Sequence, residues 1–236
     1  MRTPKNSVRI LAILIYSAGI LLGLVLAVGT IWANLEASFY FGYSVKGEKP
    51  LILVCPPLMT LSESGIVTAS IRNTTTRSLE PMIQTDISGN VLRTIRDRIP
   101  VAAGETKKVT WEVTADDVDF GNLILVKVFQ FQTFILPSAD AFCGILVLDL
   151  PFHNGNQIYF STLVVSLICI IAGLGLWTAN NQPLRYRALD ATRAMGFLAI
   201  LVLAGMIAGF FGWWGAGIIL LALTVLMVFV SLRFVT

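Results

Sequence analysis

The composition of this 236-residue chain excludes an ordinary soluble globular protein. Hydrophobic residues make up 56% of it and charged residues 13%, and the mean hydropathy is +0.78. The formal net charge is +3, with basic residues spread over several short segments, which does not form the footprint of a nucleic-acid-binding protein. We therefore expect an integral membrane protein without a nucleic-acid partner.

Four stretches are apolar enough to cross a hydrocarbon core of about 30 Å, which takes roughly 20 helical residues. They are Ile10–Ala33, Ile158–Trp177, Ala194–Phe211 and Gly212–Leu232. The last two adjoin, so we expect a tight helical hairpin around Gly212. The first has the basic start of a signal peptide, but its apolar run is longer than the roughly 7–15 residues usual for one. We expect it to be retained as a span.

The distribution of Lys and Arg predicts the orientation. Basic residues lie in the N-terminal segment 1–9, in the loop 178–193 and in the tail 233–236, and these parts together have 7 basic residues and 1 acidic residue. Segment 34–157 has 10 basic and 13 acidic residues. We expect a multi-pass protein of the cell (plasma) membrane, with both termini cytoplasmic and residues 34–157 extracytoplasmic.

Segment 34–157 has the residue pattern of β-structure. In Ile66–Arg72 and Val109–Thr114, apolar and polar side chains alternate strictly, which is typical of half-buried strands. Further strands are expected at Leu51–Cys55, Met82–Ile87, Val91–Ile99, Leu123–Phe131 and Phe142–Leu148. About seven short strands separated by turn residues predict an antiparallel, immunoglobulin-like β-sandwich. The expected fold class is therefore α+β, with this sandwich inserted between the first and second of four transmembrane helices.

The sandwich segment resembles bacterial cell-surface immunoglobulin-like domains of the CARDB type. The resemblance rests on a strand that ends at Asn73, a turn with the sequence Pro-Val-Ala-Ala-Gly-Glu-Thr at 100–106, and a strand that carries Trp111. It covers about 90 residues and none of the spans. It implies a spacer, adhesion or docking domain and carries over no catalytic residue.

The predicted topology also resembles that of claudin-like proteins, which have four spans, both ends inside and a large first outer loop rich in strands. The claudin signature of Trp, Gly-Leu-Trp and paired Cys is missing from the loop, and segment 34–157 is far longer than a claudin loop. We interpret this second resemblance as convergence.

Two cysteines, Cys55 and Cys143, fall near the first and last strands of the predicted sandwich. Outside the cytoplasm they could form a disulfide. Two separate buried thiols are the alternative, and a metal or redox pair would lack neighbouring His or Cys ligands. Cys169 lies in the middle of the second span, where a small apolar packing residue is expected.

An acidic run at Asp116, Asp117 and Asp119 is the candidate metal site, because hard carboxylate oxygens suit Ca²⁺. The run lacks the spacing and the Gly of a calcium loop, so a solvated turn is the alternative. We expect no cofactor and no catalytic residue.

Two kinds of contact surface stand out. Small residues at helical spacing, Gly19 with Gly23 and Gly205 with Gly209, form GxxxG pairs that serve either packing within the chain or contact with another protein. An apolar segment at the end of a strand could dock on the bilayer or on a partner, unless half of it is core. Its residues are Phe129, Phe131, Phe134, Ile135 and Leu136.

The spans carry no charged residue away from their ends, whereas ion pathways and proton relays usually need one. We therefore expect a non-enzymatic accessory or scaffold subunit of a larger complex in a prokaryotic envelope, with other integral membrane proteins, in a hetero- or homo-oligomer, and the lipid bilayer as partners. The alternative is a surface receptor or adhesin that binds a glycan, peptide or ion through the sandwich. A membrane enzyme acting on lipid is the third and least favoured class.

Overall fold

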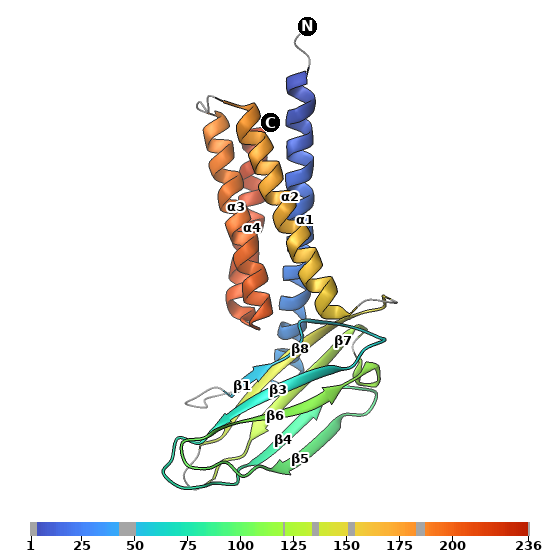
Figure 1. Ribbon diagram of the computed structural model, residues 1–236, viewed down its shortest axis with the longest axis vertical. Coiled ribbons are helices and arrows are strands. Elements are labelled where there is room, and N and C mark those ends of the chain that lie inside the picture. Colours follow the sequence, from blue (N-terminus) through green and yellow to red (C-terminus); the bar gives the residue numbers. More distant parts are fainter. Residues whose placement is uncertain are drawn as a thin grey trace. The chain divides into compact units, whose positions relative to one another are not determined.

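The computed structural model describes residues 4–42, 51–119, 121–133, 137–150, 154–182 and 187–235 (Figure 1). The chain divides into two compact units. The helical unit comprises Met1–Ile31 and Tyr159–Thr236, and the sandwich unit comprises Trp32–Ile158. The mixed α+β content agrees with the fold class predicted from the sequence.

The described helices are α1 (Pro4–Tyr40), α2 (Gly155–Asn180), α3 (Arg187–Phe210) and α4 (Trp214–Val235). Three of them hold segments long and apolar enough to cross a membrane, namely Ser7–Tyr40, Gly155–Asn180 and Ala188–Phe210. The described apolar part of α4, Trp214–Phe229, is shorter. These helices are consistent with a membrane protein, and the fourth span stays a prediction.

The tight turn between α3 and α4 has a clear local cause. Gly212 adopts a φ of 68°, a left-handed conformation that suits glycine. The N–H of Trp213 donates to the carbonyl of Ala208 (2.8 Å), and the N–H of Gly212 donates to that of Gly209 (3.1 Å). This pair of bonds is a Schellman motif, which satisfies the last carbonyls of α3 and ends the helix.

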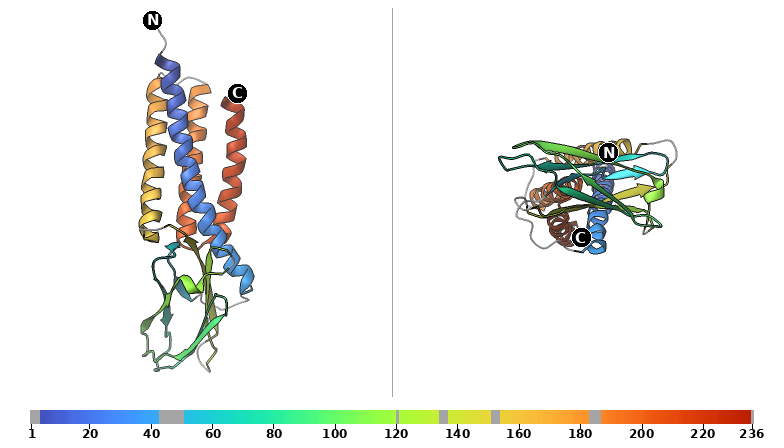
Figure 2. Two further views of the ribbon diagram at one scale, coloured as in Figure 1. Left: turned by 90° about the vertical axis from the view of Figure 1, so that its right-hand side faces the viewer. Right: turned by 90° about the horizontal axis from the view of Figure 1, so that it is seen from below.

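The sandwich unit contains eight described strands in two sheets. They are β1 (Ile52–Val54), β2 (Leu58–Thr60), β3 (Gly65–Arg72), β4 (Met82–Ile87), β5 (Arg93–Arg98), β6 (Thr106–Val113), β7 (Leu123–Gln130) and β8 (Ala139–Leu148). The three-stranded sheet has the order β1-β3-β6, and the five-stranded sheet has the order β2-β8-β7-β4-β5. Figure 2 shows the two sheets as facing layers.

The core lies between the two sheets and follows the alternation read from the sequence. Val67, Ala69 and Ile71 of β3 are buried, and they belong to one cluster with Trp111 of β6 and the inward residues of β7 and β8. Burying one such aliphatic side chain contributes roughly 1.5–3 kcal/mol. The alternation of β3 and β6 is therefore confirmed as the basis of the fold.

The structure corrects two expectations, one about strand pairing and one about the end of α1. The sandwich is not wholly antiparallel, because β2, which was not predicted, pairs in parallel with β8. The chain leaves the three-stranded sheet after β1 and joins the other sheet beyond Pro56 and Pro57, which lack the N–H needed for a continuous ladder. In addition, α1 continues beyond Ala33 to Tyr40, because its last turns pack on the sandwich.

Candidate interaction surfaces

The outer face of β7 and β8 is covered by the last turns of α1. Ala33 and Ala37 form a buried cluster with Leu123 and Leu125 of β7. Three partly buried side chains, Phe41, Phe142 and Leu146, pack against this cluster. The small side chains of α1 let the helix lie close to the sheet, so this part of the five-stranded sheet is not open to another molecule.

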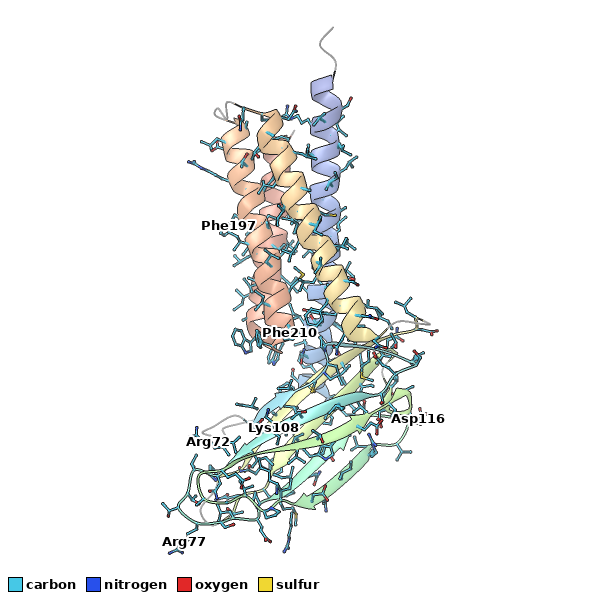
Figure 3. All side chains as sticks on the ribbon, in the orientation of Figure 1. Arg72, Arg77, Lys108, Asp116, Phe197 and Phe210 are labelled. Carbon is cyan, nitrogen blue, oxygen red and sulfur yellow. A yellow bond between two sulfur atoms is a disulfide. The ribbon has the colours of Figure 1, made fainter. Side chains whose placement is uncertain are left out.

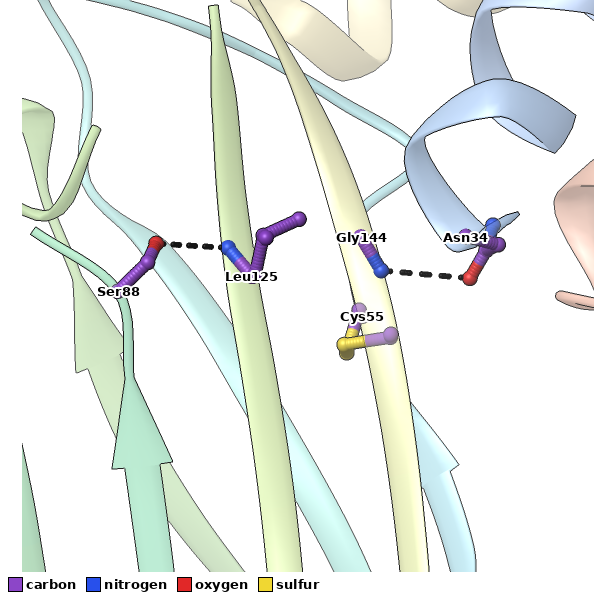
Figure 4. Close-up of a disulfide and its surroundings, with 6 residues drawn as sticks. Asn34, Cys55, Ser88, Leu125 and Gly144 are labelled. Carbon is purple, nitrogen blue, oxygen red and sulfur yellow. Dashed lines mark hydrogen bonds between the residues drawn. A yellow bond between two sulfur atoms is a disulfide. The ribbon is translucent and has the colours of Figure 1, made fainter. Parts of the chain in front are cut away.

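Gly144 of β8 makes this close approach feasible. A Cβ atom at this position would collide with the carbonyl of Ala33 and would lie 2.9 Å from the backbone nitrogen of Asn34. The N–H of Gly144 donates to Oδ1 of Asn34 at 3.3 Å (Figure 4). A glycine in the middle of a strand often marks a close backbone approach, and this signal could have identified Gly144 from the sequence.

Lys127 ties the end of α1 to the same sheet. Its Nζ donates to the carbonyl of Phe41 (3.2 Å) and lies 3.9 Å from Oδ2 of Asp140. A cation at the C-terminal end of a helix is favourable, because the free carbonyls there carry partial negative charge. Lys127 thus adds a polar contact between the end of α1 and the part of the five-stranded sheet that α1 covers.

The remaining outer part of that sheet, on β4 and β5, carries a closed polar network. Nε of Arg96 donates to Oε1 of Gln84 (2.9 Å), and Nε2 of Gln84 donates to Oδ2 of Asp86 (2.9 Å). The hydroxyl of Thr94 also donates to Asp86, at 2.7 Å. The side chains of Gln84, Asp86, Thr94 and Arg96 therefore bond to one another.

The first residue of α2 is held by the sandwich unit. Oε1 of Glu63 accepts hydrogen bonds from the N–H of Gly155 (2.7 Å) and from the N–H of Thr60 (2.8 Å). A carboxylate at a helix N-terminus satisfies a free N–H and complements the helix dipole. Local sequence pattern does not identify this role of Glu63, because Glu63 and Gly155 lie far apart in the chain.

Cys55 and Cys143 form a disulfide with a Cα–Cα distance of 6.5 Å (Figure 4). Cys55 follows β1 of the three-stranded sheet and Cys143 belongs to β8 of the five-stranded sheet, so the bond joins the two layers. The structure thus favours the disulfide over two separate thiols. Cys169 is free and partly buried in α2.

The acidic run is arranged around Asp117, which is already engaged by other groups of the sandwich. Asp117 lies in a short 3₁₀ helix, Ala115–Asp117, where its Oδ2 accepts from Nη2 of Arg93 (2.8 Å) and from the N–H of Thr114 (2.9 Å). Within the described residues, no group of three or more His, Cys, Asp or Glu side chains converges as metal ligands would. This geometry gives no support to the Ca²⁺ candidate of Asp116, Asp117 and Asp119, because Asp117 is engaged by Arg93 and by the turn itself; the candidate stays a prediction.

Asn73, at the end of β3, holds two loops together. Its Nδ2 donates to the carbonyls of Arg77 (2.7 Å), Val101 (3.1 Å) and Ala102 (3.0 Å). Its Oδ1 accepts from the N–H (2.9 Å) and from the hydroxyl (2.7 Å) of Thr75. Asn73 is only 1% exposed, so its amide is a structural centre and is not open to modification in the folded protein.

We expect Asn73→Ala to lower the free energy of unfolding of the sandwich by about 2–3 kcal/mol, because it removes several buried hydrogen bonds and leaves carbonyls unsatisfied. Native-state hydrogen exchange of core amides in β3 and β7 would measure this loss. Thr74→Ala, at an exposed neighbouring position, is the matched control and should change exchange little. Equal exchange in Asn73→Ala and the unmodified chain would contradict the assigned role.

The GxxxG pairs lie at contacts within the helical unit. A Cβ atom at Gly19 would lie 2.8 Å from the nitrogen of Ile170 and 2.8 Å from the carbonyl oxygen of Ser166, both in α2. At Gly23 it would lie 2.6 Å from Cγ1 of Val202 in α3. The hydroxyl of Ser166 donates to the carbonyl of Gly19 at 2.8 Å. This pair therefore serves packing between the chain's own helices.

The second pair, Gly205 and Gly209 on α3, packs tightly against α1 at only one of its two positions. A Cβ atom at Gly209 would collide with Oγ1 of Thr30, whereas the nearest atom at Gly205 would be Cβ of Ala27, at an ordinary 3.7 Å. At other glycines of the helices an added Cβ atom would have no neighbouring atom within 4 Å, namely at Gly175 of α2, Gly196 of α3 and Gly215 of α4.

The predicted apolar docking patch is described only in part. The rings of Phe129 and Phe131 make an edge-to-face contact with centroids 4.8 Å apart, and both side chains are partly buried. Phe134, Ile135 and Leu136 lie outside the described residues. The patch therefore stays a prediction.

Within the described residues, the fold and these contacts define a class of protein: a chain with three helices able to span a membrane and an immunoglobulin-like β-sandwich that packs on the end of α1 and the start of α2. A scan against known protein families gives no match, and a search of curated proteins gives none either.

Three solved structures each match less than half of this chain. The CARDB domain of the PF1109 protein from Pyrococcus furiosus, determined in complex with di-metal ions, is 10% identical with a TM-score of 0.31, over 44% of this chain and 95% of that chain. A Paenibacillus cycloisomaltooligosaccharide glucanotransferase is 19% identical (TM-score 0.33, 42% of this chain), and a Bacteroides uniformis β-glucuronidase is 15% identical (TM-score 0.33, 41% of this chain). The matching segment spans 13% of each of these two enzymes. Likenesses at this level carry no argument about function.

Proposed function

We propose that this chain is a non-enzymatic accessory or scaffold subunit of a larger membrane protein complex. In this proposal it crosses the membrane four times, both termini are cytoplasmic, and the sandwich lies outside the cytoplasm. The disulfide supports this placement, because such bonds persist in oxidising compartments. The basic residues that flank the apolar helices support the same orientation.

The observation that carries the proposal is the way in which the sandwich unit holds both helical segments that enter it. The last turns of α1 pack on β7 and β8 through Ala33 and Gly144, and Glu63 binds the first residue of α2. A spacer or adhesin on a flexible stalk needs no such contacts. Contacts that order the two helix ends support a role in binding a partner, because preorganisation lowers the entropic cost of binding.

A contact with partner helices would best use α2. Ile168 and Ile171 are exposed on this helix, and Gly175 has open space around it. Exposed apolar side chains beside a small residue allow another helix to approach closely within a membrane. By contrast, Gly19 and Gly23 are already engaged inside the chain.

The test is extraction from native membranes in a mild detergent, followed by size analysis and mass spectrometry of co-migrating proteins. A stoichiometric set of other membrane subunits is the expected result. A protein that migrates alone, near its own mass of 25.7 kDa plus detergent, would overturn the proposal.

We expect Gly175→Leu to release the partner subunits while the chain itself remains folded, because the new side chain enters open space. Gly196→Leu on α3, also in open space, is the matched control and should retain the partners. The measurement is the ratio of partner to chain after extraction, with at least a tenfold fall expected for the first variant, which corresponds to about 1.4 kcal/mol. Equal ratios in the two variants would contradict a contact through α2.

The alternative function is a surface receptor or adhesin that binds a glycan, peptide or ion through the sandwich. The outer face of the three-stranded sheet, which is exposed among the described residues at Ile52, Val54 and Ile66, favours it. Ligand binding by a chain that lacks partner subunits would support this alternative.

A further inference from the structure

Three boundaries of the apolar helices lie at one end of the helical unit. Arg9 directly precedes the first predicted span, Trp177 is the last residue of the second, and Arg193 directly precedes the third. The start of α1, the end of α2 and the start of α3 share this end of the unit (Figure 1). In a membrane, residues at such boundaries lie at the level of the lipid headgroups.

Arg9 of α1 lies over the indole ring of Trp177 of α2. Its Cζ atom is 4.8 Å from the ring centroid, which is a cation–π contact between the two helices. The ring is fixed, because Trp177 is 4% exposed and its Nε1 donates to Oγ1 of Thr192 in α3 at 3.2 Å. The carbonyl of Trp177 also accepts from Nδ2 of Asn181 at 2.7 Å. Residues of three helices thus fix the position of one guanidinium group.

Contacts in the next turns join the same three helices. The hydroxyl of Tyr16 in α1 donates to the carbonyl of Met195 in α3 at 2.6 Å. A Cβ atom at Gly173 of α2 would lie 2.6 Å from the backbone nitrogen of Tyr16, so α1 and α2 are in close contact there. A ligand therefore meets Arg9 on a scaffold that is already ordered, which lowers the entropic cost of binding.

The charge of Arg9 is not neutralised by the helical unit. Arg9 is exposed, and within the described residues it has no carboxylate partner. The sequence of this unit contains one acidic residue, Asp190, whose Oδ1 lies 3.9 Å from Nη1 of Arg193. A guanidinium group carries its N–H donors in a planar fork that matches two oxygens of a phosphate. Arg9 is therefore open to an anion from outside this unit.

The surface that follows Arg9 along the helices is apolar. Ile10 and Leu14 of α1 are 59% and 61% exposed. Exposed apolar side chains also occur on α3, where Figure 3 labels Phe197. A ligand that contacts Arg9 and these side chains together must have an anionic group joined to an apolar chain. A phospholipid has this structure and is present at headgroup level, whereas a free anion has nothing to place on the apolar surface.

We propose that Arg9 and Trp177 form the headgroup site of an anionic phospholipid. Arg9 donates to the phosphate oxygens, Trp177 orients the guanidinium group, and the acyl chains lie along the exposed apolar side chains of α1. Basic sites between transmembrane helices recognise lipid headgroups by the same chemistry. An anionic lipid is favoured over phosphatidylcholine, because the choline group would bring a further positive charge to a cation that no carboxylate neutralises. The proposal rests on the membrane placement in the proposed function but not on the presence of partner subunits.

The test uses the full chain, purified in an uncharged detergent, and native mass spectrometry to count bound lipids. The probes are phosphatidylglycerol, phosphatidylcholine with the same acyl chains, and inorganic phosphate. We expect phosphatidylglycerol to bind more tightly than phosphatidylcholine and to resist displacement by an equal concentration of inorganic phosphate. Equal binding of the two lipids would overturn the proposal, and so would displacement by phosphate, because the site would then take a free anion.

Arg9→Gln should bind phosphatidylglycerol about tenfold more weakly, because it removes hydrogen bonds to a charged group. Arg193→Gln is the matched control, since it removes one exposed cation at the same end of the unit, beside Asp190. It should bind nearly like the unmodified chain. Unchanged binding in Arg9→Gln would overturn the proposal, and equal losses in both variants would do so by showing a response to net charge alone.

The competing occupant of this site is a carboxylate of a partner subunit. If Arg9→Gln released partner subunits during extraction from native membranes but bound phosphatidylglycerol as before, Arg9 would belong to a protein contact and the lipid site would be wrong. If the unmodified chain bound no lipid but kept its partner subunits, the lipid site would fail while the scaffold proposal remained intact.

Discussion

Loss of the Cys55–Cys143 disulfide is expected to lower the free energy of unfolding of the sandwich by about 4–5 kcal/mol. The two cysteines are 88 residues apart, and a cross-link over a loop of that length removes much of the conformational entropy of the unfolded chain. The bond also joins the two sheets at the core, where Cys143 is 6% exposed. The measurement is hydrogen exchange of the β7 and β8 amides, with and without a reductant, in the full chain.

The control for this prediction is Cys169→Ser, which also removes a sulfur but lies in α2 outside the sandwich unit. It should leave the exchange of the β7 and β8 amides unchanged. Cys55→Ser/Cys143→Ser should behave like the reduced chain, and the reductant should then have no further effect. If the double variant exchanged as slowly as the unmodified chain, the disulfide would have no stabilising role.

The disulfide also provides a test of the proposed topology. A sandwich outside the cytoplasm meets an oxidising environment, in which the bond forms and persists. In intact cells, a membrane-impermeant maleimide should then fail to label Cys55 and Cys143. After the cells are lysed and the protein is reduced and denatured, the same reagent should label both. Labelling without any reductant would contradict the proposed placement.

The sequence predicted the parts of the fold that depend on local pattern. Alternation identified β3 and β6, because each buries one face, and apolar length identified the helices that can cross a membrane. It missed β2, a three-residue strand that follows two prolines and is defined only by its pairing with β8. A strand this short has no periodicity of its own.

Contacts between distant segments could not be predicted in the same way. Hydropathy falls after Ala33, so the span was expected to end there, yet the helix continues because Ala33 and Ala37 pack on β7. The cap that Glu63 provides for α2 and the loops joined by Asn73 likewise depend on tertiary structure. The GxxxG pairs were visible in the sequence, but only their neighbours show that they serve internal packing.

Replacement of Gly144 by valine is expected to free the last turns of α1 from the sheet. Its side chain would occupy the position of the Ala33 carbonyl, and a backbone obstacle cannot move aside as a flexible side chain can. Overpacking of this kind costs about 3 kcal/mol. Hydrogen exchange at residues 33–40 should therefore become faster by about two orders of magnitude. The core between the sheets should change less, because Gly144 faces away from it.

Two further variants separate this packing effect from a general loss of stability. Asn34→Ala removes the hydrogen bond to the N–H of Gly144 but leaves the close approach intact, so it should cost only about 1 kcal/mol. Gly175→Ala adds a methyl group in open space within α2 and should be neutral or favourable by about 1 kcal/mol. If Gly144→Val accelerated exchange no more than Asn34→Ala, the helix end would be held by the hydrogen bond rather than by close packing. The scaffold proposal would then lose its main support, because the close packing of α1 on the sheet would not be what holds the helix end.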